Sequence, residues 1–545
     1  MPMNLRGLIF SVATALVCVA ISAMPKPELP ARTRSVRLQP TASQFPERPR
    51  HGVDTGDLPF TGRSVHVGAD GDLQAAIDDA RPGDSIELEP GATYHGPFRL
   101  PRKDGSGWIQ IGSTSPPSQL GAGQHVSPTA AAGMPKLIAS SASVIIAEPA
   151  SHHYRLVGLE IAPDDGAFLH DLVQLGHDET AVENLPHHIV IDRCYVHGDR
   201  RRGARRGIAL NSRDTAVVHS YLSDFKEVGA DSQAIAGWNG TGPFTIADNY
   251  IEAAGENVLF GGADPTIPNL VPADIEVLRN HLAKPLVWRV GTSEFQGVAW
   301  TVKNLFELKN ARRVLVDGNV LEYNWPHAQN GFAILFTVRN QDGASPWSTV
   351  EDVIFQNNLV QHVASAINIL GNDDIHPSQP TRRIAILNNL FVDVGGRWGA
   401  GRLFQLLEGV SDVRIDHNTA FQTDFVVFGG ERTPNESFVF ENNLVLHNRY
   451  GVIGSGTASG RATLDRYFPH GVVKRNVIVG APATSYPPDN FFPSSIAGVG
   501  FVDRQRGDYR LASSSPYKRA ATDGRDPGAD INAVAPLVAR ERAGS

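Results

Sequence analysis

Residues 353–360 read VIFQNNLV, in which aliphatic and polar residues alternate, an asparagine pair forms a turn, and two aliphatic residues follow. Similar stretches are VLVDGNVL at 314–321, IAILNNLF at 384–391 and FVFENNLV at 438–445. Ten such stretches align at one shared position, which is asparagine in eight of them. The matched residues are Cys194, Ser220, Asn249, Asn280, Asn319, Asn358, Asn389, Asn418, Asn443 and Asn476.

The matched positions lie 25 to 39 residues apart. A repeat of this length that is built from short alternating strands predicts a β-solenoid. Helical repeats of similar length would need a periodicity of about 3.6 residues, which these stretches lack. Asparagine tolerates the left-handed backbone region, and its amide can form hydrogen bonds along a stack of turns. We therefore expect a ladder of asparagines that holds the turns and takes no part in chemistry.

The chain has 545 residues, a net charge of -8 and a pI of about 6.2. This balance argues against a nucleic-acid-binding protein, because phosphate binding requires a basic surface. Charged residues make up 19% of the chain and hydrophobic residues 41%, which excludes bulk disorder. With Cys 2 in total, a cysteine-based zinc site is excluded as well.

The N-terminus predicts export, because Arg6 precedes an apolar run at residues 8–23. An uncleaved membrane anchor is the alternative, although the run is short for a membrane span. We expect a secreted or periplasmic monomer with no membrane span once the signal is removed. The expected segments are a signal peptide at 1–23, a Pro/Arg-rich linker at 24–62, the solenoid at 63–533 and a C-terminal tail at 534–545.

Residues 71–100 predict a cap on the first coil. Leu73, Ala76, Ile77 and Ala80 fall at helical spacing, and short strands follow. With this cap, the coil length and the asparagine turns, the chain resembles the pectate-lyase-like superfamily. The resemblance implies an all-β fold, a single-stranded right-handed parallel β-helix with an N-terminal helical cap. That fold is found in lyases, hydrolases, epimerases, esterases and binding proteins, so it leaves the reaction open.

Polar residues gather where equivalent positions of successive coils stack, about 4.8 Å apart. Glu307 and Lys309 alternate with Phe306 and Leu308, so we expect the first two to point outward and the other two inward. The next coil carries Arg339 at the matching place. The residues that follow the second strand of each coil are Asn239, Asp264, Lys309 with Asn310, Arg339 with Asn340, Asn372 with Asp373 and Asp374, and Glu408.

This pattern suits the β-elimination of a uronate-containing polysaccharide. Such a lyase needs a base for the proton next to the carboxylate and positive charge to neutralise that carboxylate. A lysine beside an arginine can serve, because like charges lower the pKa of lysine. Glu307, Lys309 and Arg339 also resemble the β-helical alginate and chondroitin lyases. That resemblance implies that Lys309 is the base, that Arg339 assists the carboxylate or the leaving group, and that Glu307 supports Lys309 or a cation.

In two respects the chain departs from that family: Glu307 is nearer to the lysine, and Arg339 is farther from it. A solvated face with a weak ion pair is the alternative interpretation. The candidate substrate-binding residues, several of them in the aromatic loop at 322–331, are Trp325, His327, Gln329, Asn340, Asp373 and Asp374.

Carboxylates within two coils form a candidate Ca²⁺ site, with Asp231, Glu256 and Asp264 as its ligands. Carboxylates of this cluster, which also contains Asp248 and Glu252, could instead be the acid and base of an inverting hydrolase, or plain surface charge.

Two pairs of histidines precede strands, at residues 152–153 and 187–188. Their spacing does not indicate a metal site, so we expect them to be turn residues. The basic run RRRGARR at 200–206 either contacts an acidic polymer or is solvated.

We therefore predict an exported carbohydrate-active protein, in first place a polysaccharide lyase with an acidic polysaccharide as its partner. A glycoside hydrolase and a non-catalytic polysaccharide-binding solenoid are the alternatives.

Overall fold

The structure is a computed structural model that describes residues 45–56, 61–534 and 537. The expected signal peptide at 1–23 lies outside the described residues, as do most of the expected linker at 24–62 and most of the expected tail. In the part that is described, no helix has the length and hydropathy needed to cross a bilayer.

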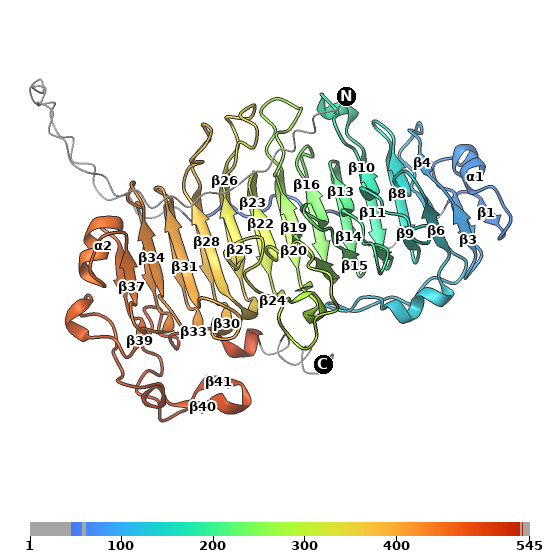
Figure 1. The fold of residues 1–545 in the computed structure, drawn as a ribbon. Coiled ribbons are helices and arrows are strands. Elements are labelled where there is room, and N and C mark those ends of the chain that lie inside the picture. The colour runs from blue at the N-terminus through green and yellow to red at the C-terminus, as the bar shows by residue number, and fades with distance from the viewer. Residues whose placement is uncertain (1–44, 57–60, 535–536, 538–545) are drawn as a thin grey trace, which may run out of the picture. The chain divides into compact units, whose positions relative to one another are not determined.

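Three long parallel sheets make up the described fold (Figure 1). Sheets A, B and C contain 14, 13 and 12 strands within the described residues. The chain passes from A to B to C and returns to A in each coil, so neighbouring strands of one sheet are one coil apart in sequence. The right-handed parallel β-helix predicted from the sequence is confirmed.

The strands of sheet A are β1 Ser64–Val67, β2 Ser85–Leu88, β5 Ile109–Ser113, β8 His152–Val157, β11 His187–Asp192, β14 Arg213–Val218, β17 Phe244–Ala247, β20 Ala273–Leu278, β23 Ala311–Asp317, β26 Val350–Gln356, β29 Arg382–Leu387, β32 Ser411–Asp416, β35 Val439–Glu441 and β38 Val472–Lys474. The strands of sheet B are β3 Thr93–His95, β6 Lys136–Ala139, β9 Glu160–Pro163, β12 Tyr195–His197, β15 Tyr221–Phe225, β18 Tyr250–Ala253, β21 His281–Ala283, β24 Val320–Asn324, β27 Leu359–Val363, β30 Leu390–Val394, β33 Thr419–Gln422, β36 Leu444–Leu446 and β39 Val477–Val479. The strands of sheet C are β4 Phe98–Leu100, β7 Ile145–Ala147, β10 Asp171–Leu175, β13 Arg206–Leu210, β16 Gln233–Gly237, β19 Glu256–Phe260, β22 Phe306–Leu308, β25 Phe332–Thr337, β28 Ser365–Leu370, β31 Arg402–Leu407, β34 Val427–Gly430 and β37 Val452–Gly454. Outside these sheets lie the antiparallel pair β40 Phe501–Asp503 and β41 Asp508–Leu511, the α-helices α1 Leu73–Asp79 and α2 Arg461–Tyr467, and the 3₁₀ segments Pro128–Gly133, Val182–Asn184, Leu286–Trp288, Ala483–Ser485, Ile496–Val499 and Arg504–Arg506.

The turn between sheets A and B contains the predicted asparagine ladder. The backbone N–H of Asn280 donates to Oδ1 of Asn319 at 2.8 Å, and that of Asn319 donates to Oδ1 of Asn358 at 2.9 Å. The Asn319 side-chain amide donates in turn to the carbonyl of Val277 at 2.8 Å. Because these asparagines are at most 1% exposed, each rung satisfies polar groups that water cannot reach.

The ladder begins with a cysteine and a serine, and it extends one rung beyond the aligned positions. The backbone N–H of Cys194 donates to the Ser220 hydroxyl at 3.0 Å, and that of Ser220 donates to Oδ1 of Asn249 at 2.8 Å. At the other end, the backbone N–H of Asn476 donates to Oδ1 of Asn490 at 2.9 Å. The sequence alignment missed Asn490, because that rung lies only 14 residues further along the chain.

The first coil is capped by α1, as predicted. Leu73 and Ile77 are its buried residues, and the Asp72 carboxylate accepts a hydrogen bond from the N–H of Ala75 at 2.9 Å. A side-chain acceptor at this place satisfies one of the unpaired N–H groups at the start of a helix.

Residues 45–56, expected as part of a linker, lie across the outward side of sheet A. Their backbone N–H groups donate to side chains of three strands, and the path runs from later coils toward earlier ones. The contacts are Glu47 to Asp352 of β26 at 3.0 Å, Arg50 to Asp274 of β20 at 2.9 Å and Val53 to Thr245 of β17 at 3.2 Å.

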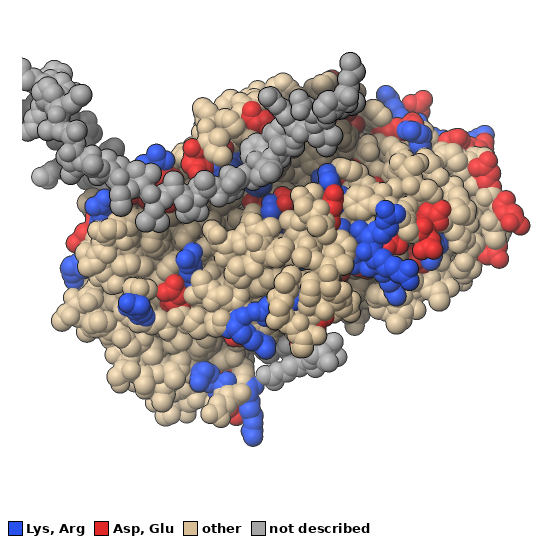
Figure 2. All heavy atoms as spheres, viewed as in Figure 1, with Lys and Arg blue, Asp and Glu red and all other residues tan. Residues whose placement is uncertain are grey.

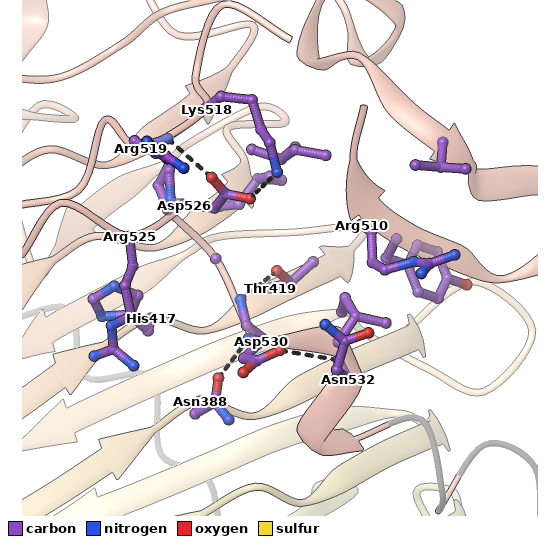
Figure 3. A pocket seen from close by; sticks show the side chains of 18 of the residues that line it. Asn388, His417, Thr419, Arg510, Lys518, Arg519, Arg525, Asp526, Asp530 and Asn532 are labelled. Carbon is purple, nitrogen blue, oxygen red and sulfur yellow. Dashed lines mark hydrogen bonds and ion pairs between the residues drawn. The ribbon is translucent and has the colours of Figure 1, made fainter. Parts of the chain in front are cut away.

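The end of the described chain packs against the turn between sheets A and B. The N–H of Asp530 donates to Oδ1 of Asn388 at 2.6 Å (Figure 3). A cavity of about 610 Å³ remains beside this contact. Lys518 and Asp526 form a 2.6 Å ion pair there.

Candidate functional site

Strand β22 carries the outward residues predicted from alternation. Phe306 and Leu308 are fully buried in the core, and Glu307 lies between them. The side chain of Lys309, immediately after the strand, is 17% exposed. The prediction of which side chains point inward is therefore confirmed for this coil.

Lys309 and Arg339 lie on adjacent coils, as the alignment predicts. The backbone N–H of Arg339 donates to the carbonyl of Lys309 at 2.9 Å. The Lys309 Nζ lies 3.8 Å from Oε1 of Glu307, whose side chain is 2% exposed. On the preceding coil, Gly261 has a φ of +92°, and a Cβ there would stand 2.9 Å from the Cβ of Lys309. Glycine at this position therefore leaves room for the lysine.

Two carboxylates hold the Arg339 guanidinium. Asp373 Oδ1 lies 2.8 Å from Nη1, and Asp374 contacts the same nitrogen. Burial alone would lower the pKa of Arg339, but these two partners raise it. The positive charge of Arg339 beside Lys309 is therefore compensated by these two carboxylates.

One hollow on the outward side of sheet C, with a volume of about 310 Å³, is lined by Glu307, Lys309, Arg339 and Asp374. We call it the sheet C pocket. Glu431 and Arg432 follow β34. They were not found from the sequence because the column of polar residues aligned there ended at Glu408, one coil earlier. The charged and amide-bearing residues that line the pocket are Glu307, Lys309, Gln329, Arg339, Asn368, Asp374, Glu408, Glu431 and Arg432.

A buried charge network lies next to the pocket. Lys303 contacts Asp231 and lies 3.5 Å from Glu256. Burial and the nearby charge of Glu307 raise the pKa of Glu256, although Lys303 opposes the shift. Burial would lower the pKa of Lys303, but the surrounding carboxylates raise it. The Asn304 amide donates to Glu307 at 2.9 Å and fixes that carboxylate.

The candidate Ca²⁺ ligands do not form one site. Asp231 and Glu256 share Lys303, whose ammonium takes the place that a cation would need. Asp264 instead accepts hydrogen bonds from the N–H of Ala344 at 2.8 Å and from the Ser345 hydroxyl at 2.7 Å. These carboxylates therefore do not fit a shared Ca²⁺ ion, and we assign them no metal chemistry.

The predicted substrate-binding residues divide into buried and accessible ones. Trp325 is 4% exposed in a cluster with other tryptophans, so its ring does not face the pocket. Asn340, at 1% exposure, donates to a loop carbonyl, and the Asp373 side chain is also 1% exposed. These three are structural, which corrects the prediction. Asp374 is 49% exposed and, with Gln329, lines the pocket.

His327 is exposed in the same loop as Trp325. Its Nδ1 accepts a hydrogen bond from the N–H of Val302 at 3.2 Å. It is not among the residues that line the sheet C pocket, so the structure does not bring it together with Lys309.

A second cavity, of about 620 Å³, lies on the outward side of sheet B. Burial and the Asp224 carboxylate raise the pKa of Glu252 there to about 7. Burial would also raise the pKa of Glu322, but hydrogen bonds from His281 and Gln361 lower it. The rings of Tyr221 and Tyr250, stacked 4.3 Å apart, line the same cavity. The cavity therefore holds two carboxyl groups whose pKa values are shifted in opposite directions.

The basic run at 200–206 is largely compensated. Arg205 pairs with Glu227, and Arg206 pairs with Asp171 at 2.6 Å. Figure 2 shows a group of basic side chains bordered by acidic ones over the coils around β11 and β15.

No protein-family model matches the chain, and no curated protein matches it either. Similar solved structures include the alginate lyase from Paenibacillus sp. str. FPU-7, with 15% identity, a TM-score of 0.34, and coverage of 63% of this chain and 97% of that one. The catalytic unit of the GH87 α-1,3-glucanase from Streptomyces thermodiastaticus strain HF3-3 has 14% identity and a TM-score of 0.48, over 84% and 72% of the chains. The A-module of the mannuronan C-5 epimerase AlgE4 from Azotobacter vinelandii has 11% identity and a TM-score of 0.40, over 74% and 94%.

The resemblance to pectate-lyase-like β-helices is confirmed at the level of the fold, by the three parallel sheets of this chain. With TM-scores below 0.5, these likenesses do not bear on the reaction. The proposals below therefore rest on this chain's own side chains.

Proposed function

We propose that the chain is a carbohydrate-active enzyme that cleaves a uronate-containing polysaccharide by β-elimination in the sheet C pocket. One observation carries the proposal: the Lys309 amine is partly exposed in the pocket while its partner Glu307 is buried behind it. A base that is accessible and held from behind is the arrangement that proton abstraction needs.

In this proposal the Lys309 Nζ takes the proton next to the uronate carboxylate. The electron pair of that C–H bond forms the C=C bond, the bond to the 4-linked oxygen breaks, and the departing oxygen takes up a proton from water. Glu307 positions Lys309 and is itself fixed by Asn304. Because Arg339 is charge-compensated, it contributes N–H donors to the substrate rather than free charge. Gln329, which also lines the pocket, supplies an amide.

The test is the ultraviolet absorbance of the unsaturated product from alginate, pectate and chondroitin. We expect Lys309→Ala to lower the rate by about 10²- to 10⁴-fold, the usual contribution of a general base. Lys474→Ala is the matched control, because Lys474 also pairs with a glutamate but is 42% exposed and far from the pocket. A rate that Lys309→Ala leaves unchanged would remove Lys309 from the mechanism.

A second candidate function is glycoside hydrolysis in the sheet B cavity. Glu252 is in register with Ala283, and Ala283 is in register with Glu322, so the two glutamates are two coils apart. At about 4.8 Å per coil, that separation is roughly 9.5 Å, at the upper end of the range for inverting glycosidases. The raised pKa of Glu252 suits the general acid and the lowered pKa of Glu322 suits the base.

The two candidates give different products and depend on different residues. Hydrolysis releases reducing ends without ultraviolet absorbance, and Glu252→Gln should abolish it while Lys309→Ala should not. Polymer that is bound but never cleaved would favour the binding alternative.

Export remains a proposal, tested by sequencing the N-terminus of the protein recovered outside the cytoplasm.

A further inference from the structure

Four histidines meet where two neighbouring coils begin their sheet A strands. Nδ1 of His152 lies 2.8 Å from Nδ1 of His153, and Nδ1 of His187 lies 2.7 Å from Nδ1 of His188. His187 of β11 is in register with His152 of β8, so the two pairs stack. The ring centroids are 4.8 Å apart between His152 and His187, and 4.5 Å apart between His153 and His188.

The backbone explains why consecutive residues face the same side. On a regular strand, neighbouring side chains point to opposite faces. His153 has a φ of +60° and His188 a φ of +53°, so each occupies the left-handed region. This turn brings each histidine next to its predecessor, and Trp108 packs edge-on against His153 at 5.2 Å. The arrangement is held by the fold and is not a chance meeting of flexible side chains.

We propose that this cluster binds a divalent transition-metal ion of the class that prefers imidazole, such as Zn²⁺, Cu²⁺ or Ni²⁺. Among the described residues, His153, His187 and His188 each offer a ligand atom within 4.8 Å of the others. Two nitrogens that bind one ion at about 2.0–2.1 Å stand roughly 3 Å apart. The two Nδ1 pairs already have nearly this separation.

Within each pair, metal binding requires a change of tautomer, and the stacked rings must also turn their nitrogens toward a shared ion. Without metal, a 2.7 or 2.8 Å contact between two ring nitrogens means that one Nδ1–H donates to the other Nδ1. When both Nδ1 atoms bind the ion, that proton must move to Nε2. The rings therefore need no net loss of protons, provided that they are neutral beforehand.

Burial lowers the pKa of three of the four rings. Burial, with the charge of neighbouring histidines, lowers the pKa of His153 to about 4. Burial, Arg213 and the other rings lower that of His187 to about 3. Burial and Arg102 also lower the pKa of His152, and Asp104 opposes this shift. All of these shifts favour the unprotonated form that a metal ion needs.

The surrounding charges are balanced. Arg213 of β14 is in register with His187 and would repel a cation. Its guanidinium lies 3.5 Å from Oδ2 of Asp214, and the same carboxylate lies 3.7 Å from Nδ1 of His188. Asp214 therefore offsets the arginine and places a negative charge beside the proposed ion.

The experiment titrates the full-length chain, free of any polyhistidine tag, with ZnCl₂ by calorimetry and with CuCl₂ by electron paramagnetic resonance. CaCl₂ serves as the ion of the wrong class. We expect one ion per chain, with copper signals split by nitrogen, and affinity at least tenfold weaker in His153→Gln and in His188→Gln. The matched control is His66→Gln, because His66 is exposed and lies in β1, away from the cluster.

Circular dichroism spectra show whether each variant keeps its fold. A variant that fails to fold is replaced by His187→Asn, which removes one ligand with a smaller change in shape. Saturable binding that is lost in the cluster variants and kept in His66→Gln supports the proposal. Absence of saturable Zn²⁺ and Cu²⁺ binding in the folded wild type overturns it, as does binding that the cluster variants leave unchanged.

Discussion

The sheet C pocket and the histidine cluster are both formed by side chains that stack on adjacent coils, but they differ in charge. In both, polar side chains from adjacent coils stack on the outward side of the solenoid. In the pocket and its buried network, opposite charges neutralise one another, with Lys303 between Asp231 and Glu256 and with Arg339 between two aspartates. In the histidine cluster, burial, nearby arginines and the neighbouring rings lower the pKa of three of the four rings.

The difference has consequences for stability and for function. A network of paired charges loses stability when one partner is removed, because the other is left buried and uncompensated. A cluster of neutral bases loses little stability when one ring is removed, but it then loses ligands for a metal ion. The first region should therefore respond to substitution in unfolding experiments and the second in binding experiments.

The largest expected effect is that of Lys303→Met. Glu256 is 0% exposed and its carboxylate would lose its cation. We expect the free energy of unfolding to fall by about 3–5 kcal/mol, the usual result of breaking a buried pair. Denaturant unfolding measures this change. The matched control is Lys474→Met, which breaks an ion pair of a 42%-exposed lysine and should cost at most about 1 kcal/mol. Equal losses in the two variants would contradict this account of the network.

Much of the fold could be predicted because the same residue type recurs at the same place in every coil. The ladder that contains Asn319 and Asn358 could be predicted from the spacing of the repeated stretches alone. Glu307 and Lys309 could be placed outward because β22 is a regular strand. The alternation of side chains fixes their direction there, and coil alignment brings Arg339 beside them.

Residues outside regular strands could not be placed in this way. Trp325 lies in a loop, where no periodicity tells an inward ring from an outward one, and it proved to be buried. His153 and His188 were expected in turns, but they lie at the start of strands β8 and β11, each with a left-handed backbone. The sequence gives no sign that this backbone turns each ring toward its predecessor, so the cluster was missed. The ion pairs of Arg339 with two aspartates could not be predicted either. Those aspartates lie in a loop, and the repeat spacing does not define the path of a loop.

The next effect in size concerns the space for Lys309. We expect Gly261→Ala to lower both stability and lyase activity. The backbone at φ +92° disfavours alanine, and the added Cβ would lie 2.7 Å from the N of Asn310 and 2.9 Å from the Cβ of Lys309. The strain should cost about 1–3 kcal/mol. Gly297→Ala is the matched control, with φ +90° and no atom within 4 Å of its Cβ. Activity that falls only in Gly261→Ala would locate the effect at Lys309, and an equal fall in both would refute it.

A smaller effect distinguishes the neighbours of the histidine cluster from its ligands. Asp214→Asn removes the carboxylate beside His188 and leaves Arg213 uncompensated. We expect Zn²⁺ affinity to fall by about fivefold, because two unit charges about 4 Å apart in water interact by about 1 kcal/mol. Calorimetry measures the change, with Asp178→Asn as the control because Asp178 is 80% exposed and lies beside a different histidine. Unchanged affinity in Asp214→Asn would show that this carboxylate does not support the site.

The smallest effect is the pH dependence of stability that arises from the same rings. Unfolded histidines take up protons near pH 6.5, whereas folded His153 does so near pH 4 and His187 near pH 3. Between these values the unfolded chain binds more protons, so stability is present above about pH 6.5 and falls as the pH drops toward 4. The effect is modest because both rings are partly exposed.

The measurement is the denaturant midpoint of wild type and of a His153→Gln, His187→Gln double variant at several pH values. The variant should lose less stability than wild type on acidification, and saturating Zn²⁺ should steepen the loss in wild type alone, because protons and metal compete for the same nitrogens. Parallel pH profiles would mean that the rings are not held neutral by the fold, and the contrast with the paired charges of sheet C would then fail.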